Sequence, residues 1–370
     1  MEKKVIVISF VNLSAKVGGA YTILKECLTS LIDNNLDKDY KIITVLNSKE
    51  VSPFENIECI ELPLSKKSWL FRIYYEYFYF RRLSKKLKPF LWLSLHDMTP
   101  NVKAERQAVY MHNPSVFYKW KWSDLFVDWK IILFASFYKY AYRINVHRND
   151  FLIVQQSWLR DSFSRMLNVD KRKIVVSRPQ NNALQNMTDL PKSDNIVRFL
   201  YVSVPRIYKN FEVICEAVKI LNEKSVGGFE VNLSLAASPD NKYATMIYNK
   251  YHNVGNINFL GLLLKDDLLH QYARTDCLIF ASKLETWGLS ISEFAAYHKP
   301  VLLADLPYAH ESSAGCMQTA FFAPDNSAEL ASLMENIIVK DYSNLHPTDK
   351  LRISEPFASS WSDLWKILLK

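Results

Sequence analysis

Apolar runs with the length of buried strands alternate with stretches of helical spacing along most of this chain. This alternation is typical of parallel sheets covered by helices, because parallel strands need long crossover connections. It runs from Val5 to Ser177 and starts again at Val197. The chain has 370 residues, more than the roughly 250–300 at which a single core stops growing. The pattern predicts an α/β protein with two doubly wound, Rossmann-like domains facing a central cleft.

The predicted first domain covers residues 1–178, and the second covers 197–354. Between them, residues 179–196 are proline- and amide-rich without apolar periodicity, which predicts a linker. Strands are expected at 5–10, 40–45, 57–62, 90–94, 107–111, 151–155, 173–177, 197–203, 230–236, 257–260, 277–281 and 301–304, the last closing the series. Helices are expected at 20–32, 65–87, 123–143, 157–167, 211–221, 266–273 and 290–297.

The five cysteines are odd in number and never form a C-x-x-C pair, so neither a disulfide framework nor a zinc site is indicated. A reducing, cytoplasmic environment is the simplest expectation. The basic start followed by Val5–Phe10 has a short apolar run and no cleavage site, and we interpret it as a first strand rather than a signal peptide. No apolar run reaches the ~18 residues of a spanning helix. The protein is therefore expected to be soluble or to lie on a membrane surface.

Much of the net charge of +8 comes from residues 66–88, which contain eight Lys or Arg residues and a single acidic residue, Glu76. Nine aromatic residues are interleaved with these cations up to Phe90. On a helix, Trp69, Ile73, Phe80 and Leu87 would pack inward, and Phe71, Tyr75 and Phe78 would lie opposite, beside Arg82 and Lys85. With the similar segment 117–143, the stretch 66–90 predicts contact with an anionic membrane surface. The alternatives are a buried helix with snorkelling cations and a nucleic-acid binder; the latter is not expected, because no nucleic-acid module is present.

The most informative segment places Glu285 and Gly288 in a loop between a strand and a helix, with Glu293 one turn into that helix. A helix start offers unpaired N–H groups, so a diphosphate can sit over Gly288, Leu289 and Ser290. The two carboxylates can accept hydrogen bonds from hydroxyl groups at both ends of one elongated ligand. Ser290-x-x-Glu293 is alternatively a capping box that only closes the helix start.

Two further junctions between a strand and a helix carry residues suited to binding a phosphate group. Arg206 and Lys209 lie after the first strand of the second domain, where two cations can neutralise charge on a departing nucleoside diphosphate. Gly18 and Gly19 lie after the first strand of the chain and allow a tight turn with exposed N–H groups. A solvated helix start and a merely flexible turn are the simpler interpretations.

His112 follows another predicted strand and is a candidate for orienting a ligand or relaying a proton. The competing candidate is His96, followed by Asp97, and a loop histidine without a role is the simpler alternative. No cluster of His, Cys or Asp has the spacing of metal ligands, so no metal or other cofactor is expected.

The segment from Glu285 to Glu293, with the continuation Lys299-Pro300-Val301 and Asp305-Leu306-Pro307, resembles the E-x7-E region of glycosyltransferase family 4. That family consists of retaining enzymes of the GT-B fold that use a nucleotide-sugar donor. The resemblance implies that Glu285 contacts donor-sugar hydroxyls and Glu293 the nucleotide ribose. Thr286-Trp287-Gly288 replaces the Gly-Phe-Gly of many relatives, which leaves the donor's identity open.

Other features match the same family. The resemblance assigns Arg206 and Lys209 to the donor phosphates, Gly18 and Gly19 to the phosphate and sugar, and His112, in His-x-Pro, to the transferred sugar. It also implies that a helix at about 355–370 packs back on the first domain. Many such relatives act on lipid-linked saccharides at the cytoplasmic leaflet, which implies a peripheral enzyme of cell-surface polysaccharide synthesis (O-antigen, capsule or lipopolysaccharide) on the inner face of the plasma membrane. A nucleotide-sugar epimerase of the same fold, an inactive sugar-binding protein and a transferase with a soluble acceptor are the alternatives.

Overall fold

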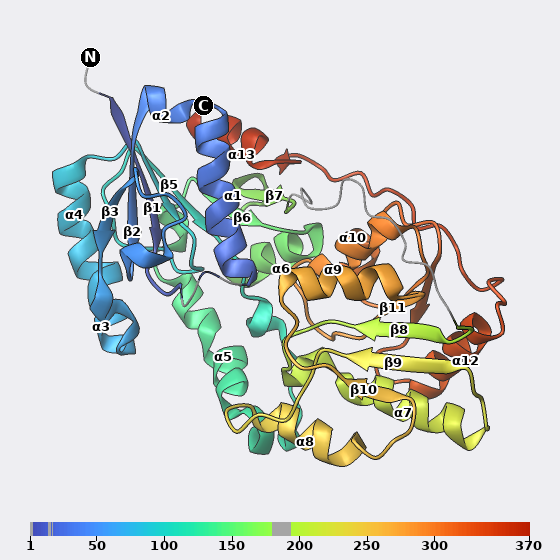
Figure 1. Cartoon of the computed structure of the whole chain (residues 1–370). Coiled ribbons are helices and arrows are strands. Elements are labelled where there is room, and N and C mark those ends of the chain that lie inside the picture. The colour runs from blue at the N-terminus through green and yellow to red at the C-terminus, as the bar shows by residue number, and fades with distance from the viewer. Residues whose placement is uncertain (1–2, 14–15, 17, 180–193) are drawn as a thin grey trace. The chain divides into compact units, whose positions relative to one another are not determined.

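The computed structural model describes residues 3–13, 16, 18–179 and 194–370, which divide into two compact units (Figure 1). Unit 1 contains residues 1–116, 136–180 and 353–370, and unit 2 contains 117–135 and 181–352. The sequence placed Phe117–Ala135 in the first domain, whereas the structure groups this segment with unit 2. Residues 180–193 of the predicted linker lie outside the described part of the chain.

The sheet of unit 1 has, among the described residues, eight parallel strands in the order β14-β7-β6-β5-β4-β1-β2-β3. They are β1 (Lys4–Phe10), β2 (Tyr40–Leu46), β3 (Glu58–Glu61), β4 (Leu91–Ser94), β5 (Arg106–Tyr110), β6 (Phe151–Val154), β7 (Ile174–Ser177) and β14 (Phe357–Ala358). The accompanying helices are α1 (Gly19–Asp33), α2 (Leu36–Asp39), α3 (Trp69–Tyr74), α4 (Phe80–Leu87), α6 (Ser157–Leu167) and α13 (Trp361–Leu369). Helix α5 (Leu125–Arg143) begins in unit 2 and ends in unit 1.

The two faces of this sheet are covered by different helices. Successive side chains of a strand point to opposite faces, and β1 places Ile6 and Ile8 in one buried cluster and Val7 in another. The first cluster includes apolar residues of α1 and α13, which lie side by side in Figure 1. The second includes Phe80 of α4. The last helix of the chain therefore completes the core built around the first strand.

The segment from α3 to α4 is helical as predicted, but it is turned differently from the expectation. A π-helical turn, Tyr75–Tyr79, joins the two helices. Trp69 and Ile73, which were expected to pack inward, are 47% and 41% exposed. The buried residues at helical spacing are instead Arg72, Glu76, Phe80 and Ser84. The prediction was right for Phe80, which is fully buried, and for Leu87, which packs against the same cluster. It was wrong for Trp69 and Ile73, because the inward face is partly polar: Arg72 donates to the carbonyl of His96, and Glu76 is paired with the His96 ring.

The sheet of unit 2 has, within the described residues, six parallel strands in the order β10-β9-β8-β11-β12-β13. They are β8 (Val197–Tyr201), β9 (Phe229–Leu233), β10 (Ile257–Phe259), β11 (Cys277–Phe280), β12 (Val301–Ala304) and β13 (Thr319–Phe322). Its helices are α7 (Phe211–Glu223), α8 (Lys242–Tyr251), α9 (Lys265–Arg274), α10 (Leu289–Phe294), α11 (Pro307–Ser312) and α12 (Ser327–Ile338). The expectation that residues 301–304 close the series was wrong, since β13 pairs with β12.

In each sheet, two neighbouring strands mark the point where the strand order reverses. These pairs are β1 with β4 in unit 1 and β8 with β11 in unit 2. Ligands of doubly wound sheets bind at the carboxyl ends of the strands at such a point. The predicted α/β class with two Rossmann-like units is confirmed. Among the described helices, none has the length and apolar character needed to cross a bilayer.

Candidate functional site

Two loops of unit 2 leave the carboxyl ends of β8 and β11 and are bound to each other. The first, residues 206–210, carries two predicted cations, and the second, residues 281–288, carries Glu285. Asn210 donates its side-chain N–H groups to the carbonyls of Ala281, at 3.2 Å, and of Pro324, at 2.7 Å. Lys283 N–H donates to the carbonyl of Tyr208 at 2.7 Å. These bonds fix the two loops at the strand-order reversal of unit 2. No local sequence signal marks Asn210 for this role.

Lys209 and Glu285 were predicted separately and form a direct ion pair between Nζ and Oε1. Their side chains are only 14% and 13% exposed. The backbone of Lys209 is also held, because the Tyr201 hydroxyl donates to its carbonyl at 2.6 Å. A pair so sheltered from water interacts more strongly than a surface pair. The structure thus places a cation and an anion in direct contact at the carboxyl-terminal edge of this sheet.

Arg206 lies at the start of the same loop and is 56% exposed. Its Nη1 is 3.7 Å from Oδ2 of Asp128, where non-helical torsions interrupt α5. The nearby rings of Tyr118 and Tyr208 meet edge to face at 6.0 Å. At this exposure and distance the ion pair with Asp128 contributes little stability, so Arg206 remains available to a ligand.

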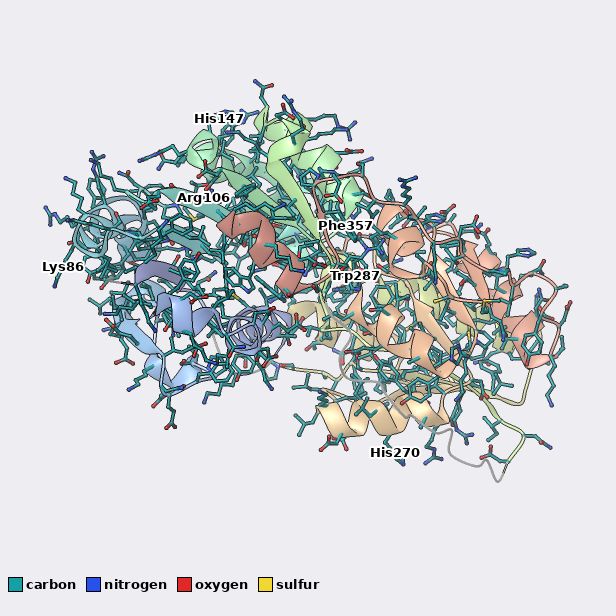
Figure 2. The ribbon with its side chains drawn as sticks, turned by 90° about the horizontal axis from the view of Figure 1, so that it is seen from above. Lys86, Arg106, His147, His270, Trp287 and Phe357 are labelled. Carbon is teal, nitrogen blue, oxygen red and sulfur yellow. The ribbon has the colours of Figure 1, made fainter. Side chains whose placement is uncertain are left out.

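Gly288 ends the second loop and begins α10, where Leu289 and Ser290 are the first helical residues. Its φ of 85° lies in the left-handed region, and a Cβ there would stand 3.1 Å from Cδ1 of Ile291. Trp287, labelled in Figure 2, is buried and donates Nε1–H to the Ser292 hydroxyl at 3.0 Å. Trp287 is therefore held against the start of α10.

Glu293 does not act as the partner of a capping box. The residue before α10 is Gly288, which has no side chain to cap with, and Glu293 instead accepts a hydrogen bond from the Tyr272 hydroxyl at 3.0 Å. Burial raises the pKa of Glu293, and the bond from Tyr272 opposes that rise. Tyr272, on α9, was not singled out from the sequence, because nothing in its local pattern marks it as a partner of Glu293.

The remaining predicted residues belong to unit 1. Gly18, with φ of 84°, precedes α1, and Gly19 is its first residue; a Cβ on either would meet open space. His112 follows β5 with 20% of its side chain exposed. His96 follows β4 and is fully buried. The ring nitrogens of His96 face Glu76 Oε1 and, at 3.1 Å, the carbonyl of Ser9.

His112 differs from His96 in its hydrogen bonding. Its Nε2 is 3.7 Å from Oδ2 of Asp97, beyond hydrogen-bond range, and among the described residues its buried Nδ1 has no partner. Asp97 was noted in the sequence only as the neighbour of His96. Of the two histidines, His112 has the partly exposed ring without a hydrogen bond among the described residues, whereas His96 is buried and bonded.

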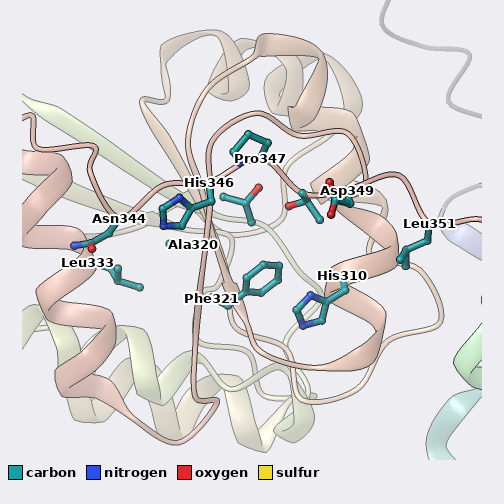
Figure 3. A pocket seen from close by; sticks show the side chains of 11 residues that line it. His310, Ala320, Phe321, Leu333, Asn344, His346, Pro347, Asp349 and Leu351 are labelled. Atoms are coloured by element: carbon teal, nitrogen blue, oxygen red, sulfur yellow. The ribbon is translucent and has the colours of Figure 1, made fainter.

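Two other features of the chain bear on metal and ligand binding. An Asp-x-Asp triplet, Asp37-Lys38-Asp39, lies on α2 with exposed side chains, and no three His, Cys, Asp or Glu side chains among the described residues are placed to hold a metal. A cavity of about 560 Å³ beside β13 is lined by residues that include His310, Phe321 and His346 (Figure 3). None of the predicted site residues lines that cavity.

Comparison with known proteins identifies a family domain within unit 2. Residues 184–346 match the model of the glycosyl transferases group 1, so the second half of the chain carries a domain of this family. The O-antigen chain mannosyltransferase RfbU of Salmonella typhimurium is 22% identical over 271 residues, which are 72% of this chain and 70% of that protein.

Solved structures resemble the whole chain. WaaG, a glycosyltransferase involved in lipopolysaccharide biosynthesis, matches with a TM-score of 0.65 and 14% identity over 90% of both chains. HepE of Anabaena, solved in complex with UDP-glucose, matches with a TM-score of 0.62 and 16% identity over 92% of both chains. At these identities the likeness establishes the fold, which is α/β of the GT-B type.

Proposed function

We propose that this glycosyltransferase, whose second half is a domain of the glycosyl transferases group 1, moves a sugar from a nucleotide-sugar donor to a saccharide acceptor with retention of configuration. The observation that carries the proposal is the ion pair of Lys209 with Glu285 on adjoining loops of unit 2. It puts a group suited to phosphate beside a group suited to sugar hydroxyls, at the edge where doubly wound sheets bind ligands.

The donor diphosphate would be neutralised by Arg206 and Lys209. An ammonium group has three N–H donors, so Lys209 can keep its bond to Glu285 and still donate to a phosphate oxygen. The more exposed Arg206 can donate two parallel N–H groups to the other phosphate oxygens. Leu289 and Ser290, at the start of α10, are proposed to add backbone contacts beside Gly288. These groups supply the charge that a metal ion would otherwise provide, and we propose a reaction without a metal cofactor.

The carboxylates would hold the sugar and the nucleoside. Glu285 is proposed to accept hydrogen bonds from donor-sugar hydroxyls, and Glu293 from the ribose hydroxyls. The bond that Glu293 accepts from Tyr272 occupies one oxygen and leaves the other for a ligand. In unit 1, Gly18, Gly19 and His112 are proposed to contact the phosphate and the transferred sugar, as the family resemblance implies.

The proteins that the chain resembles support a proposal for the class of acceptor. RfbU is named as a mannosyltransferase of the O-antigen chain, and WaaG takes part in lipopolysaccharide biosynthesis. We therefore propose an acceptor in cell-surface polysaccharide synthesis, such as a lipid-linked saccharide of O-antigen, capsule or lipopolysaccharide. HepE was solved with UDP-glucose, which supports a nucleotide-sugar donor without naming the one used here.

Exposed apolar side chains on unit 1 support attachment to a membrane. Leu70 of α3 is 79% exposed, Phe78 of the π-helical turn 61%, and Phe137 of α5 61%. Trp69 of α3 meets Tyr138 of α5 at 6.2 Å, so the two helices pack together. The exposed cations of α4 are Arg81, Arg82, Lys85 and Lys86. In unit 2, Trp122, Phe126 and Trp129 are also exposed. Such surfaces bind anionic lipid headgroups, and we propose a peripheral position on the cytoplasmic leaflet.

A donor-binding and turnover series tests the function. Nucleoside diphosphates and their sugars, screened by thermal shift, should raise the melting temperature, because a ligand of the folded state stabilises it by about 2.7 kcal/mol at 100 times its Kd. With the sugar that binds, Glu285→Gln and Lys209→Met should each lower kcat by about 10²–10³-fold. The matched control is Lys283→Met, since Lys283 lies on the same loop but pairs with the exposed Asp325.

Two results would refute the proposal. One is the absence of a thermal shift with every nucleoside diphosphate and nucleotide sugar. The other is full transfer activity in Glu285→Gln. Chromatography of the donor incubated without acceptor separates transfer from epimerisation, which would convert the donor sugar on its own.

A further inference from the structure

We propose that Asp97 is a positioning residue that holds His112 for the transfer reaction; this inference rests on the proposed function, in which His112 contacts the transferred sugar. Asp97 lies in the loop after β4, and His112 lies after the neighbouring strand β5. No assignment from the sequence gave Asp97 a role of its own. Its hydrogen bonds, the support of its loop and the contrast between two histidine rings point to this role.

Asp97 binds the loop of His112 through both its carboxylate and its backbone. Its Oδ1 accepts the backbone N–H groups of His112, at 2.7 Å, and of Asn113, at 2.9 Å. Its own N–H donates to the carbonyl of Tyr110 at 3.2 Å. The Tyr142 hydroxyl of α5 donates to the carbonyl of Asn113 at 2.9 Å. The backbone that carries the His112 ring is therefore held from two sides.

The loop of Asp97 is itself rigidly supported. Asp97 is only 4% exposed, and its φ of 69° is a conformation that few non-glycine residues adopt without support. The support comes from the preceding residue. The ring of His96 is paired with Glu76 of the π-helical turn, and its carbonyl accepts from Arg72 Nη2 at 3.1 Å. Strained residues fixed by buried networks are concentrated at functional sites.

The rings of His96 and His112 differ in their hydrogen bonding. Both nitrogens of His96 are within reach of protein partners, whereas the ring of His112 has no hydrogen bond among the described residues. The His112 ring is located by packing, with its centroid 5.8 Å from that of Phe10, and by the carboxylate of Asp97 3.7 Å from Nε2. Asp97 thus fixes the position of the ring while leaving its hydrogen-bonding capacity for a ligand.

A double-mutant cycle on the full chain tests the role of Asp97. Asp97→Asn keeps an oxygen for the two backbone N–H groups and removes the charge beside the ring. It should lower kcat by about 10–100-fold, as expected for a misplaced or misoriented catalytic group, with little change in the donor KM and melting temperature. In a His112→Ala background, the same substitution should have no further effect on kcat. The control is Asp150→Asn, because Asp150 accepts the backbone N–H of Gln107 at the opposite end of β5.

The outcomes separate the inference from the function on which it rests. If His112→Ala keeps full activity, the proposed role of His112 fails, and the inference fails with it. If His112→Ala is impaired but Asp97→Asn is fully active, only the inference is overturned. It is also overturned if Asp97→Asn lowers kcat equally in both backgrounds, as a purely structural role would. The fall in kcat expected for Glu285→Gln tests the proposed function independently of all three results.

Discussion

Gly288 shows at the residue scale how a backbone conformation can fix an amino acid. It stands at the start of α10 with φ of 85°, and a Cβ would lie 3.1 Å from Ile291. We expect Gly288→Ala to lower the free energy of unfolding by about 1–3 kcal/mol, because an L-residue is strained in this region and the neighbour must move. Urea denaturation measures the change.

Gly19 provides the matched control for that substitution. It is the first residue of α1, it has no left-handed torsion, and a Cβ there would meet nothing within 4 Å. Gly19→Ala should leave the stability unchanged or raise it by up to about 1 kcal/mol, since alanine favours the helix. Equal losses in the two variants would show that the left-handed torsion at position 288 does not matter.

The sequence identified some residues of the candidate site and missed others. Glu285 and Lys209 could be predicted because each follows a buried strand in a recognisable motif, and the sheet order brings their loops together. His96 and His112 could not be separated, because the partner of His96 is Glu76, twenty residues away on a π-helical turn that carries no sequence signal. Asp97 was overlooked because its carboxylate accepts from backbone N–H groups, which every residue carries and no sequence pattern marks.

At the scale of elements, α3, the π-helical turn and α5 carry the membrane proposal. Replacing Leu70, Phe78 and Phe137 together by serine should weaken binding to anionic vesicles by at least about 10-fold, because each exposed apolar side chain contributes about 1.5–3 kcal/mol when fully buried. Vesicle co-sedimentation measures the effect, and the melting temperature should hardly change since these side chains are exposed.

The control replaces three exposed apolar residues of unit 2, Leu262, Leu264 and Val339, by serine. These are 82%, 66% and 66% exposed and lie outside the two segments assigned to the membrane. Equal binding by wild type and by the α3–α5 variant, or an equal loss in the control, would exclude this surface as the docking site.

The success of element prediction followed the strength of the apolar pattern. Helix α6 and strand β12 were predicted to the residue, because each is a clear periodic or continuous apolar run. Helices α8, α11 and α12 and strands β13 and β14 were not predicted. Strand β14 has two residues, and α8 mixes lysine and tyrosine without a strong apolar face, so tertiary pairing rather than local pattern defines them. The inward face of α3 was wrong because Arg72, whose guanidinium donates to the His96 carbonyl, is buried there in place of Trp69 and Ile73.

At the scale of the whole molecule, the last helix joins the first through a titratable contact. Glu26 of α1 accepts a hydrogen bond from Trp361 of α13, and burial raises its pKa from 4.5 to about 7. The folded state therefore holds the proton of Glu26 more tightly than the unfolded state does. The contribution of Glu26 to the free energy of unfolding is complete below pH 4.5 and is lost as the pH rises through about 7. Glu26→Gln should therefore raise the melting temperature at pH 8 more than at pH 5.

Melting curves of wild type and Glu26→Gln across this pH range provide the measurement. The variant should show a flatter pH dependence, because glutamine does not titrate. Glu50→Gln is a suitable control, as Glu50 is an exposed residue elsewhere in unit 1. A parallel course of the two curves from pH 5 to pH 8 would show that the contact between the terminal helices does not titrate in this range.

The assignment of Phe117–Ala135 to unit 2 bears on how donor preference could be exchanged between related enzymes. A chimera that grafts only residues 181–352 from a homologue would leave behind Tyr118 and Asp128, which contact Tyr208 and Arg206 of the loop proposed to bind phosphate. The graft would then combine a foreign loop with native neighbours. A chimera that exchanges residues 117–135 together with residues 181–352 would keep unit 2 intact.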